Sequence, residues 1–208
     1  MPAKSSAASP YSVHPGVFTT QVWISSLPEK TGRSLEEWIR LVQKSGPPAE
    51  RERREWLQKV HGLGTVTCWW IAQRAGGQGE EDSDPQAYLK AAAGYVEDMF
   101  RGSKAGLRPI LEALIKLGKG LGKDVKICPC KTIVPFYRRH VFAQVKPAAR
   151  TRIDFGFALG NRKPAGRLLD TGGLAKKDRI THCIRISSLD EIDGEVKRWL
   201  QTAYQLDS

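Results

Sequence analysis

The 208-residue sequence contains no long apolar run. No continuous apolar stretch of signal-peptide length stands at its N-terminus, and nowhere do about 18 uncharged apolar residues follow one another, as a membrane-spanning helix requires. Cysteine is scarce as well, because four cysteines in a chain of this length do not resemble the disulfide framework of a small secreted protein. We therefore expect a cytoplasmic protein without a membrane partner.

The first half of the chain carries no excess of positive charge, whereas the second half is strongly basic. Residues 1–100 carry 11 Lys and Arg against 12 Asp and Glu, whereas residues 101–208 carry 22 against 10. A net charge of +12 on a compact domain causes self-repulsion, and its usual use is to attract an anionic partner. The sequence therefore predicts that the second half binds a polyanion, with DNA or RNA as the expected ligand.

Composition divides the chain into four parts. Residues 1–12 are small and polar and are predicted to form a disordered tail. Residues 13–78 are predicted to form a helical module, and the acidic, glycine-rich residues 79–84 a linker. Residues 85–208 are predicted to form a basic α+β module.

Apolar residues recur at helical spacing up to Gly122. Ser34 and Glu37 form a capping box, in which each side chain satisfies a free backbone N–H at the start of a helix. Trp38 and Val42 then lie on one face of that helix. An earlier helix is expected over 17–24 and ends near Pro28. Further helices are expected within 50–60, 66–71, 89–100 and 107–121.

After Gly122 the apolar period changes from 3.6 to 2, which is typical of strands. Strands are expected over 125–128, 132–137, 141–145, 152–157 and 179–186, whereas residues 158–178 are rich in Gly and Lys and look irregular. A second capping box at Ser188–Glu191 predicts the start of a last helix. The fold class is therefore α+β: an all-helical module followed by an antiparallel sheet, with helices on one face and water on the other.

Two long segments resemble a bacterial two-module family of unknown function. Residues 31–64 (TGRSLEEWIRLVQKSG…WLQKVHGLG) are similar to the helical domain known as DUF 4287. Residues 128–204 (CPCKTIVPFYRRHVFAQVKPAARTRIDFGFALG…GRLLDTGG…ITHCIRISSLDEIDGEVKRWLQTAY) are similar to the domain known as DUF 5655. The resemblance implies the two-module architecture and leaves the function open. The strand order of the second module is also distantly similar to small α+β proteins regarded as iron chaperones.

A glycine-rich turn between two helices offers a first candidate site. Gly62 and Gly64 would let backbone N–H groups approach a phosphate, helped by Thr65 at the positive end of the next helix. DNA-gripping hairpins usually carry a Lys or Arg just after the turn, and here Val66 and Thr67 follow instead. A purely structural turn is therefore the favoured interpretation, with a backbone phosphate contact as the alternative.

The cysteines and histidines offer a second candidate, a metal site. Cys128 and Cys130 would point to one side of an extended strand, but a zinc site needs four ligands. His182 alternates with two isoleucines, which is typical of a histidine packed in a core. We therefore expect no metal, no cofactor and no catalytic residue.

The basic surface of the second module is the favoured candidate site. Its cations lie on or beside the expected strands and in the loop before the last strand. Phe136, Tyr137 and Phe142 are interleaved with them and could stack on bases. The residues expected to bind the anion are Arg138, Arg139, Arg152, Arg185, Lys176, Lys177 and Lys131.

Two alternatives of other classes stay open at this stage. One is a small-anion site or an enzyme that uses Lys131, His140 and Asp154 around the sheet, with Cys128 or Cys130 as a reactive thiol. The other is a structural module that binds a protein partner through exposed tryptophans of the helical module. The simplest explanation of the positive charge is a solvated surface of lysine and arginine that has no binding role. Each of the functional interpretations above has to be weighed against this one.

Overall fold

The computed structural model describes residues 9–208, which form two compact units. One unit, the helical unit, comprises Pro15–Tyr88. The other, the α+β unit, comprises Leu89–Ser208 together with residues 9–14 of the described chain. The α+β unit is therefore discontinuous in sequence, unlike the consecutive modules that composition indicated.

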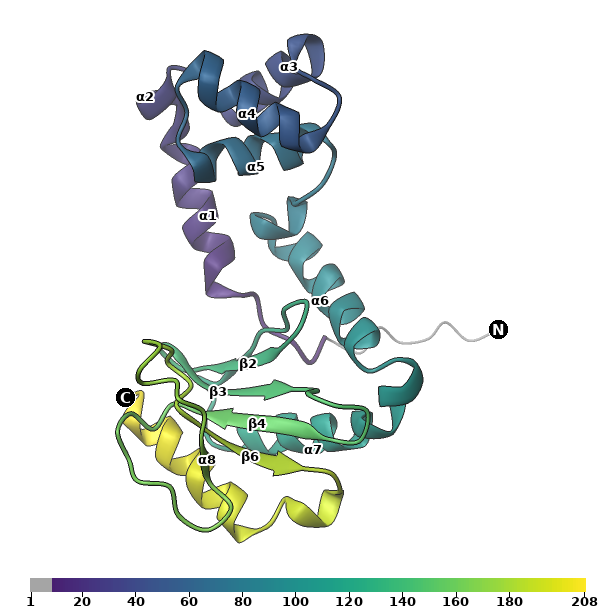
Figure 1. Cartoon of the computed structure of the whole chain (residues 1–208), viewed down its shortest axis with the longest axis vertical. Coiled ribbons are helices and arrows are strands. Elements are labelled where there is room, and N and C mark those ends of the chain that lie inside the picture. Colours follow the sequence, from purple (N-terminus) through teal and green to yellow (C-terminus); the bar gives the residue numbers. More distant parts are fainter. Residues whose placement is uncertain (1–8) are drawn as a thin grey trace. The chain divides into compact units, whose positions relative to one another are not determined.

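The helical unit is built on the predicted apolar stripes. Ser34 Oγ accepts a hydrogen bond from the Glu37 N–H at 3.3 Å, and Glu37 Oε2 accepts one from the Ser34 N–H at 2.7 Å, so the predicted capping box is present. Trp38, Leu57 and Ile71 lie in its core. Its helices are α1 Pro15–Ser25, α2 Leu27–Thr31, α3 Leu35–Ser45, α4 Glu50–His61 and α5 Thr65–Ala75 (Figure 1).

The ends of the helical unit differ in detail from the sequence prediction. The first helix is two helices, because α1 ends at Ser25 and Pro28 is accommodated in the first turn of α2. The expected linker 79–84 contains the short 3₁₀ helix η1 (Glu80–Asp82). The expected linker is also attached to the helical unit through Ser83. Gln21 Nε2 donates a hydrogen bond to the Ser83 carbonyl, and Arg74 Nη2 donates one to the Ser83 hydroxyl.

The α+β unit contains a six-stranded antiparallel sheet of order β1-β2-β3-β4-β6-β5. The strands are β1 Lys126–Ile127, β2 Val134–Tyr137, β3 Val141–Lys146, β4 Ile153–Phe157, β5 Leu169–Asp170 and β6 His182–Ile186. The short β5 lies in the stretch that we expected to be irregular. The helical elements are α6 Pro85–Met99, which begins just before this unit, η2 Gly102–Leu107, α7 Arg108–Lys119, η3 Leu189–Glu191 and α8 Gly194–Leu206.

Helices α7 and α8 pack against one face of this sheet. An added Cβ on Gly118 of α7 would meet the Phe136 ring of β2, and the Phe142 ring of β3 lies 5.7 Å from that of Tyr204 on α8. The apolar residues of the central strands and of both helices form one buried cluster. The α+β fold class is therefore confirmed (Figure 1).

Burial of Phe136 and Phe142 overturns the prediction that these two rings stack on bases, and a register shift between β2 and β3 accounts for Phe142. Phe136 pairs with Ala143, but Tyr137 pairs with Val141, so Phe142 is the extra residue of a bulge. Phe136 and Phe142 are fully buried, and their ring centroids lie 6.4 Å apart in the core. They are therefore unavailable to bases. The hydroxyl of half-buried Tyr137 is hydrogen-bonded to His14 Nε2 at 2.8 Å.

The last helix begins later than the second capping box predicted. Ser188 precedes only the 3₁₀ helix η3, and its side chain makes no cap hydrogen bond. Helix α8 starts at Gly194, where Asp193 Oδ1 accepts hydrogen bonds from the N–H groups of Glu195 and Val196. An aspartate is as good an N-cap as a serine, and it satisfies two free N–H groups here.

The expected disordered tail covers residues 1–12, of which residues 1–8 lie outside the described chain. Ser12, by contrast, is bound to the sheet, because its N–H donates a hydrogen bond to the Ile127 carbonyl at 2.8 Å. Tyr11 packs against the core of the α+β unit. Across residues 9–208, no helix combines the length and the apolar character that a bilayer crossing needs.

Candidate anion-binding site

A row of charged side chains crosses the sheet on the face opposite to α7 and α8. The register places Lys146 of β3 beside Asp154 of β4, and Asp154 beside Arg185 of β6. Arg152 lies two residues before Asp154 and therefore shares its face, and its Nε is 3.1 Å from Asp154 Oδ1. We call these four residues the basic row. It presents three cations around one carboxylate.

A well-defined loop extends the basic row with Lys176. Residues 171–180 fold back over the sheet, and Ile180 packs so closely on Gly156 that a Cβ there would lie 2.6 Å from the isoleucine methyl. Gly173 is equally constrained, by contact with the Ile180 carbonyl. Between this loop and the strands lies a hollow of about 200 Å³, the sheet hollow, lined by both Lys146 and Lys176.

A second and larger hollow adjoins the basic row at Lys146. It measures about 510 Å³ and lies where the end of α6, the β1–β2 connection and the end of β3 meet. We call it the basic hollow. It is lined by Asp98, Met99, Arg101, Ser103, Lys104, Lys131, Thr132, Lys146 and Pro147. Because Lys146 lines both hollows, the cations of the basic row and of the basic hollow are neighbours.

Most carboxylates of residues 101–208 are already used in ion pairs with arginines. Six of the ten acidic residues of this stretch take part in recorded ion pairs: Glu112, Asp124, Asp154, Asp193, Glu195 and Asp207. Their arginine partners are Arg108, Arg138, Arg152, Arg167 and Arg179. Along residues 9–208, no ion pair is found for Lys131, Lys146, Lys176 or Arg185, and these side chains are exposed. These four side chains are therefore among the cations that carry the uncompensated charge of residues 101–208.

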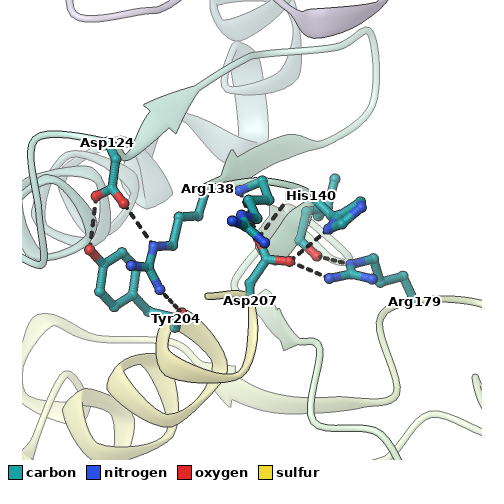
Figure 2. A network of polar contacts seen from close by, with 8 residues as sticks. Asp124, Arg138, His140, Arg179, Tyr204 and Asp207 are labelled. Carbon is teal, nitrogen blue, oxygen red and sulfur yellow. Dashed lines mark hydrogen bonds and ion pairs between the residues drawn. The ribbon is translucent and has the colours of Figure 1, made fainter.

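The structure places Arg138 in a different network, at the C-terminal end of the chain (Figure 2). The backbone of Arg139 belongs to the same network. Arg138 Nε lies 2.7 Å from Asp124 Oδ2, and its guanidinium stacks on the Tyr204 ring at 4.3 Å. Asp124 Oδ1 also accepts a hydrogen bond from the Tyr204 hydroxyl at 2.8 Å. The Arg138 hydrogen bond holds the pKa of Asp124 below its usual range. Arg138 is thus already engaged with a carboxylate.

Asp207 ties the same network together from a buried position. Its Oδ2 accepts hydrogen bonds from the backbone N–H groups of Arg139 at 3.0 Å and His140 at 2.8 Å. Its Oδ1 lies 3.0 Å from His140 Nδ1 and contacts the guanidinium of Arg179. These contacts fasten the last turn of α8 to the β2–β3 turn. The side chain of Arg139 is exposed, but its backbone has a structural role.

Lys177 lies at the tip of the loop that carries Lys176. It adopts φ = 56°, in the left-handed region that a non-glycine residue rarely occupies, and both lysines are exposed. The turn is held by hydrogen bonds from the N–H groups of Lys176 and Asp178 to the Gly173 carbonyl. The structure thus brings together Arg152, Arg185 and Lys176, with Lys131 beside them in the basic hollow and Lys177 at the rim of the loop.

The Gly62–Thr65 turn belongs to the helical unit and has the geometry of a structural cap. Gly62 has φ = 66°, and its N–H donates a hydrogen bond to the Gln58 carbonyl, closing α4. Gly64 is the N-cap residue of α5, and the Cys68 N–H donates a hydrogen bond to its carbonyl. Thr65 lines a separate hollow of about 650 Å³ together with Arg51 and Trp69.

The groups proposed for an enzyme lie in different environments. Lys131 lines the basic hollow, Asp154 lines the sheet hollow, and His140 is bound to Asp207. Burial raises the pKa of the Cys128 thiol to about 12, and burial likewise raises the pKa of Cys130. Neither thiol is therefore activated as a nucleophile. His182 is buried, as predicted, and its Nε2 is hydrogen-bonded to the Arg162 carbonyl. Residues 9–208 contain no group of three or more His, Cys, Asp or Glu placed to hold a metal ion.

The tryptophans proposed for a partner surface are mostly internal. Trp38 and Trp70 are buried, and Trp70 packs edge-to-face against Trp23 at 4.8 Å. Trp56 packs against His61 at 4.5 Å. Trp69 is 37% exposed and lines the hollow beside Thr65. Trp38 and Trp70 are therefore core residues of the helical unit and cannot form an exposed partner surface.

Three cations of the site were absent from the residues predicted to bind the anion. Lys146 alternates with buried residues of β3, so the strand pattern in the sequence could have identified it as a residue of the exposed face. Arg101 and Lys104 stand in the connection between α6 and α7, and nothing in their spacing indicates that they lie beside Lys131.

Comparison with protein families identifies both halves of the chain. A family model described as "Domain of unknown function (DUF5655)" matches residues 96–207, and one described as "Domain of unknown function (DUF4287)" matches residues 19–66. No significant match was found among curated proteins or solved structures. Since the first match covers 112 of the 208 residues, the chain belongs to the DUF5655 family, and it carries a DUF4287 match before that domain.

Proposed function

We propose that the protein binds a polyanion through the basic row, the neighbouring Lys176 and the basic hollow, and that nucleic acid is its ligand. The observation that carries this proposal is the convergence of cations from separate segments on Lys146. Lys131, Lys146, Lys176 and Arg185 come from four different parts of the chain. Charge that merely keeps a protein soluble has no need to converge in this way.

The ligand is expected to be held through its phosphates. Phe136 and Phe142 are buried in the core, so they offer no stacking platform to single-stranded bases. Lysine and arginine contacts to phosphates supply affinity and register but carry no sequence information. The protein is therefore expected to bind nucleic acid with little dependence on base sequence.

A pair of charge reversals tests this proposal in the full-length protein. The double variant Lys176→Glu/Arg185→Glu removes two cations beside the sheet hollow. We expect it to weaken binding of a fluorescent 20-base-pair duplex by about ten- to a hundredfold at low salt, measured by fluorescence anisotropy.

The matched control changes the same net charge elsewhere. Lys119 ends α7 and Lys197 lies on α8, and both side chains are exposed. Lys119→Glu/Lys197→Glu should leave binding within about threefold of the unmodified protein. Equal weakening in both double variants would attribute binding to net charge alone, and failure of the unmodified protein to bind at low salt would refute the proposal.

A further inference from the structure

The basic hollow is the larger of the two hollows in the cationic surface. Its walls come from the end of α6 with η2, from the β1–β2 connection, and from the end of β3. Lys104 Nζ donates a hydrogen bond to the Pro147 carbonyl at 2.8 Å, which joins the first wall to the third. The hollow is therefore built by contacts within the α+β unit.

Four cations and a single carboxylate line this hollow. The cations are Arg101, Lys104, Lys131 and Lys146, and the carboxylate is Asp98. Asp98 pairs with Arg101 at 3.2 Å, but both side chains are mostly exposed, and such a surface pair contributes little energy. Arg101 can therefore exchange this partner for an anionic ligand. The lining carries a net charge of +3.

The donors that line the hollow remain available to a ligand. Lys104 uses one of its three ammonium N–H groups on Pro147, which leaves two. Lys131 is exposed, and its Nζ lies 6.0 Å from the centre of the Tyr95 ring. Ser103 and Thr132 add two hydroxyl groups to the lining. Phosphate oxygens are the acceptors that such a set of ammonium, guanidinium and hydroxyl donors suits best.

The charge of the hollow discriminates between two kinds of phosphate. A phosphodiester inside a nucleic-acid strand carries one negative charge. A terminal phosphate monoester carries about −1.5 to −2 at neutral pH, because its second pKa is about 6, and it offers three free oxygens. A concave site with a net charge of +3 favours the group with the higher charge and the more accessible oxygens.

We propose that the basic hollow binds a terminal phosphate group, carried either by a free nucleotide or by the end of a nucleic-acid strand. The strand-end form deepens the proposed function and rests on it, whereas the nucleotide form stands without it. Arg101, Lys104, Lys131 and Lys146 would surround the phosphate, with Ser103 and Thr132 as additional donors. The basic row then runs on from Lys146 and would hold the phosphodiesters that follow the terminal one.

The test compares ligands that differ only in the terminal phosphate. The probes are one 20-base-pair duplex with 5′-phosphate, 3′-phosphate or hydroxyl ends, measured by anisotropy, and AMP against adenosine, measured by calorimetry. We expect a phosphorylated end, 5′ or 3′, to bind at least about tenfold more tightly than the hydroxyl end, or AMP to bind where adenosine does not. Equal affinities across all of these pairs would overturn the proposal.

Variants locate the effect. Arg101→Glu/Lys131→Glu should reduce the ratio of phosphorylated to hydroxyl affinity to about one, whereas Lys119→Glu should preserve the ratio. A phosphate preference that survives in Arg101→Glu/Lys131→Glu would place the site elsewhere and refute the proposal. Thermal unfolding of each variant checks that it is folded, and Lys131→Ala offers a milder change if the double variant fails to fold.

The two proposals fail in different ways. If the hydroxyl-ended duplex binds but no phosphate preference exists, the polyanion-binding function stands and the terminal-phosphate site is wrong. If no duplex binds but AMP does, through Arg101 and Lys131, the polyanion function is wrong and the hollow is a nucleotide site. Displacement of a phosphorylated duplex by AMP identifies the case in which both sources compete for one hollow.

Discussion

At the scale of single residues, the buried carboxylate of Asp207 accepts hydrogen bonds from several groups at once. It accepts backbone hydrogen bonds from Arg139 and His140 and contacts the side chains of His140 and Arg179. We expect Asp207→Ala to lower the free energy of unfolding by about 2–3 kcal/mol, because two backbone N–H groups lose their acceptor. Denaturant titration measures this change.

Asp207→Asn serves as the control, because its side-chain oxygen can still accept the two backbone hydrogen bonds. We expect this variant to lose about half as much stability as Asp207→Ala. Equal stability of Asp207→Ala and the unmodified protein would show that the network in Figure 2 does not hold the end of α8.

Cys128 illustrates how burial decides reactivity. Its side chain is fully buried, and burial raises the pKa of its thiol to about 12. We expect iodoacetamide to leave Cys128 unlabelled in the native protein at pH 8 and to label it after denaturation, as measured by peptide mass spectrometry. Rapid labelling in the native state would contradict the burial and would revive the possibility of a reactive thiol.

At the scale of elements, two helical glycines have opposite surroundings. A Cβ on Gly118 of α7 would lie 2.5 Å from a ring carbon of buried Phe136, whereas a Cβ on Gly94 of α6 would meet nothing within 4 Å. Gly118→Ala should therefore destabilise the protein by about 1–3 kcal/mol through overpacking. Gly94→Ala should stabilise it by about 0.5–1 kcal/mol through helix propensity. Denaturation of both variants tests this opposition in sign.

The N-cap residue of α8, Asp193, makes the stability of the folded protein depend on pH. Hydrogen bonds from backbone N–H groups, first that of Val196, lower the pKa of Asp193 below 3.8. A carboxyl group with a lowered folded-state pKa stabilises the protein above its unfolded pKa, and this contribution disappears as the pH falls through the folded value. We expect thermal stability to decrease below about pH 4. Asp193→Asn should be less stable than the unmodified protein at pH 7 and nearly equal to it at the lowest pH, as followed by thermal melts.

The sequence predicted elements well wherever a pattern is repeated. Alternation predicted the segments that contain β1, β2, β3, β4 and β6, and a capping box placed α3 correctly, because local chemistry decides both. The two-residue strand β5 lies in a Gly- and Lys-rich stretch that shows no apolar alternation. The start of α8 was missed because Ser188 and Asp193 are both good caps, and the packing of the helix on the sheet selects between them.

Candidate site residues were predictable one at a time, but their grouping was not. Arg138 and Arg152 look alike in sequence, yet Arg138 pairs with Asp124 in one network and Arg152 with Asp154 in another. Arg101 is 30 positions from Lys131, and only the tertiary fold brings them to one hollow. Phe142 was wrongly expected to face solvent, because a bulge interrupts the strict alternation of β3.

At the scale of the whole molecule, arginines and lysines use their positive charge differently: many arginines form structural ion pairs, whereas most lysines of the described chain form no ion pair. Five arginines of residues 101–208 form ion pairs with six carboxylates of the same stretch, and the planar guanidinium suits such bidentate and stacked contacts. The net charge of +12 over residues 101–208 is left largely to lysines and a few exposed arginines. This division is what we expect of a domain that uses some cations to fold and the others to bind.

The dependence of polyanion binding on salt tests the central claim most directly. If the basic row, Lys176 and the basic hollow together neutralise about five phosphates, log affinity for duplex DNA should fall with log salt concentration at a slope of about −4 to −5. Lys176→Glu/Arg185→Glu should make this slope less steep by about two, because each lost phosphate contact removes about one unit. A flat salt response, or a slope that the double variant leaves unchanged, would contradict the account.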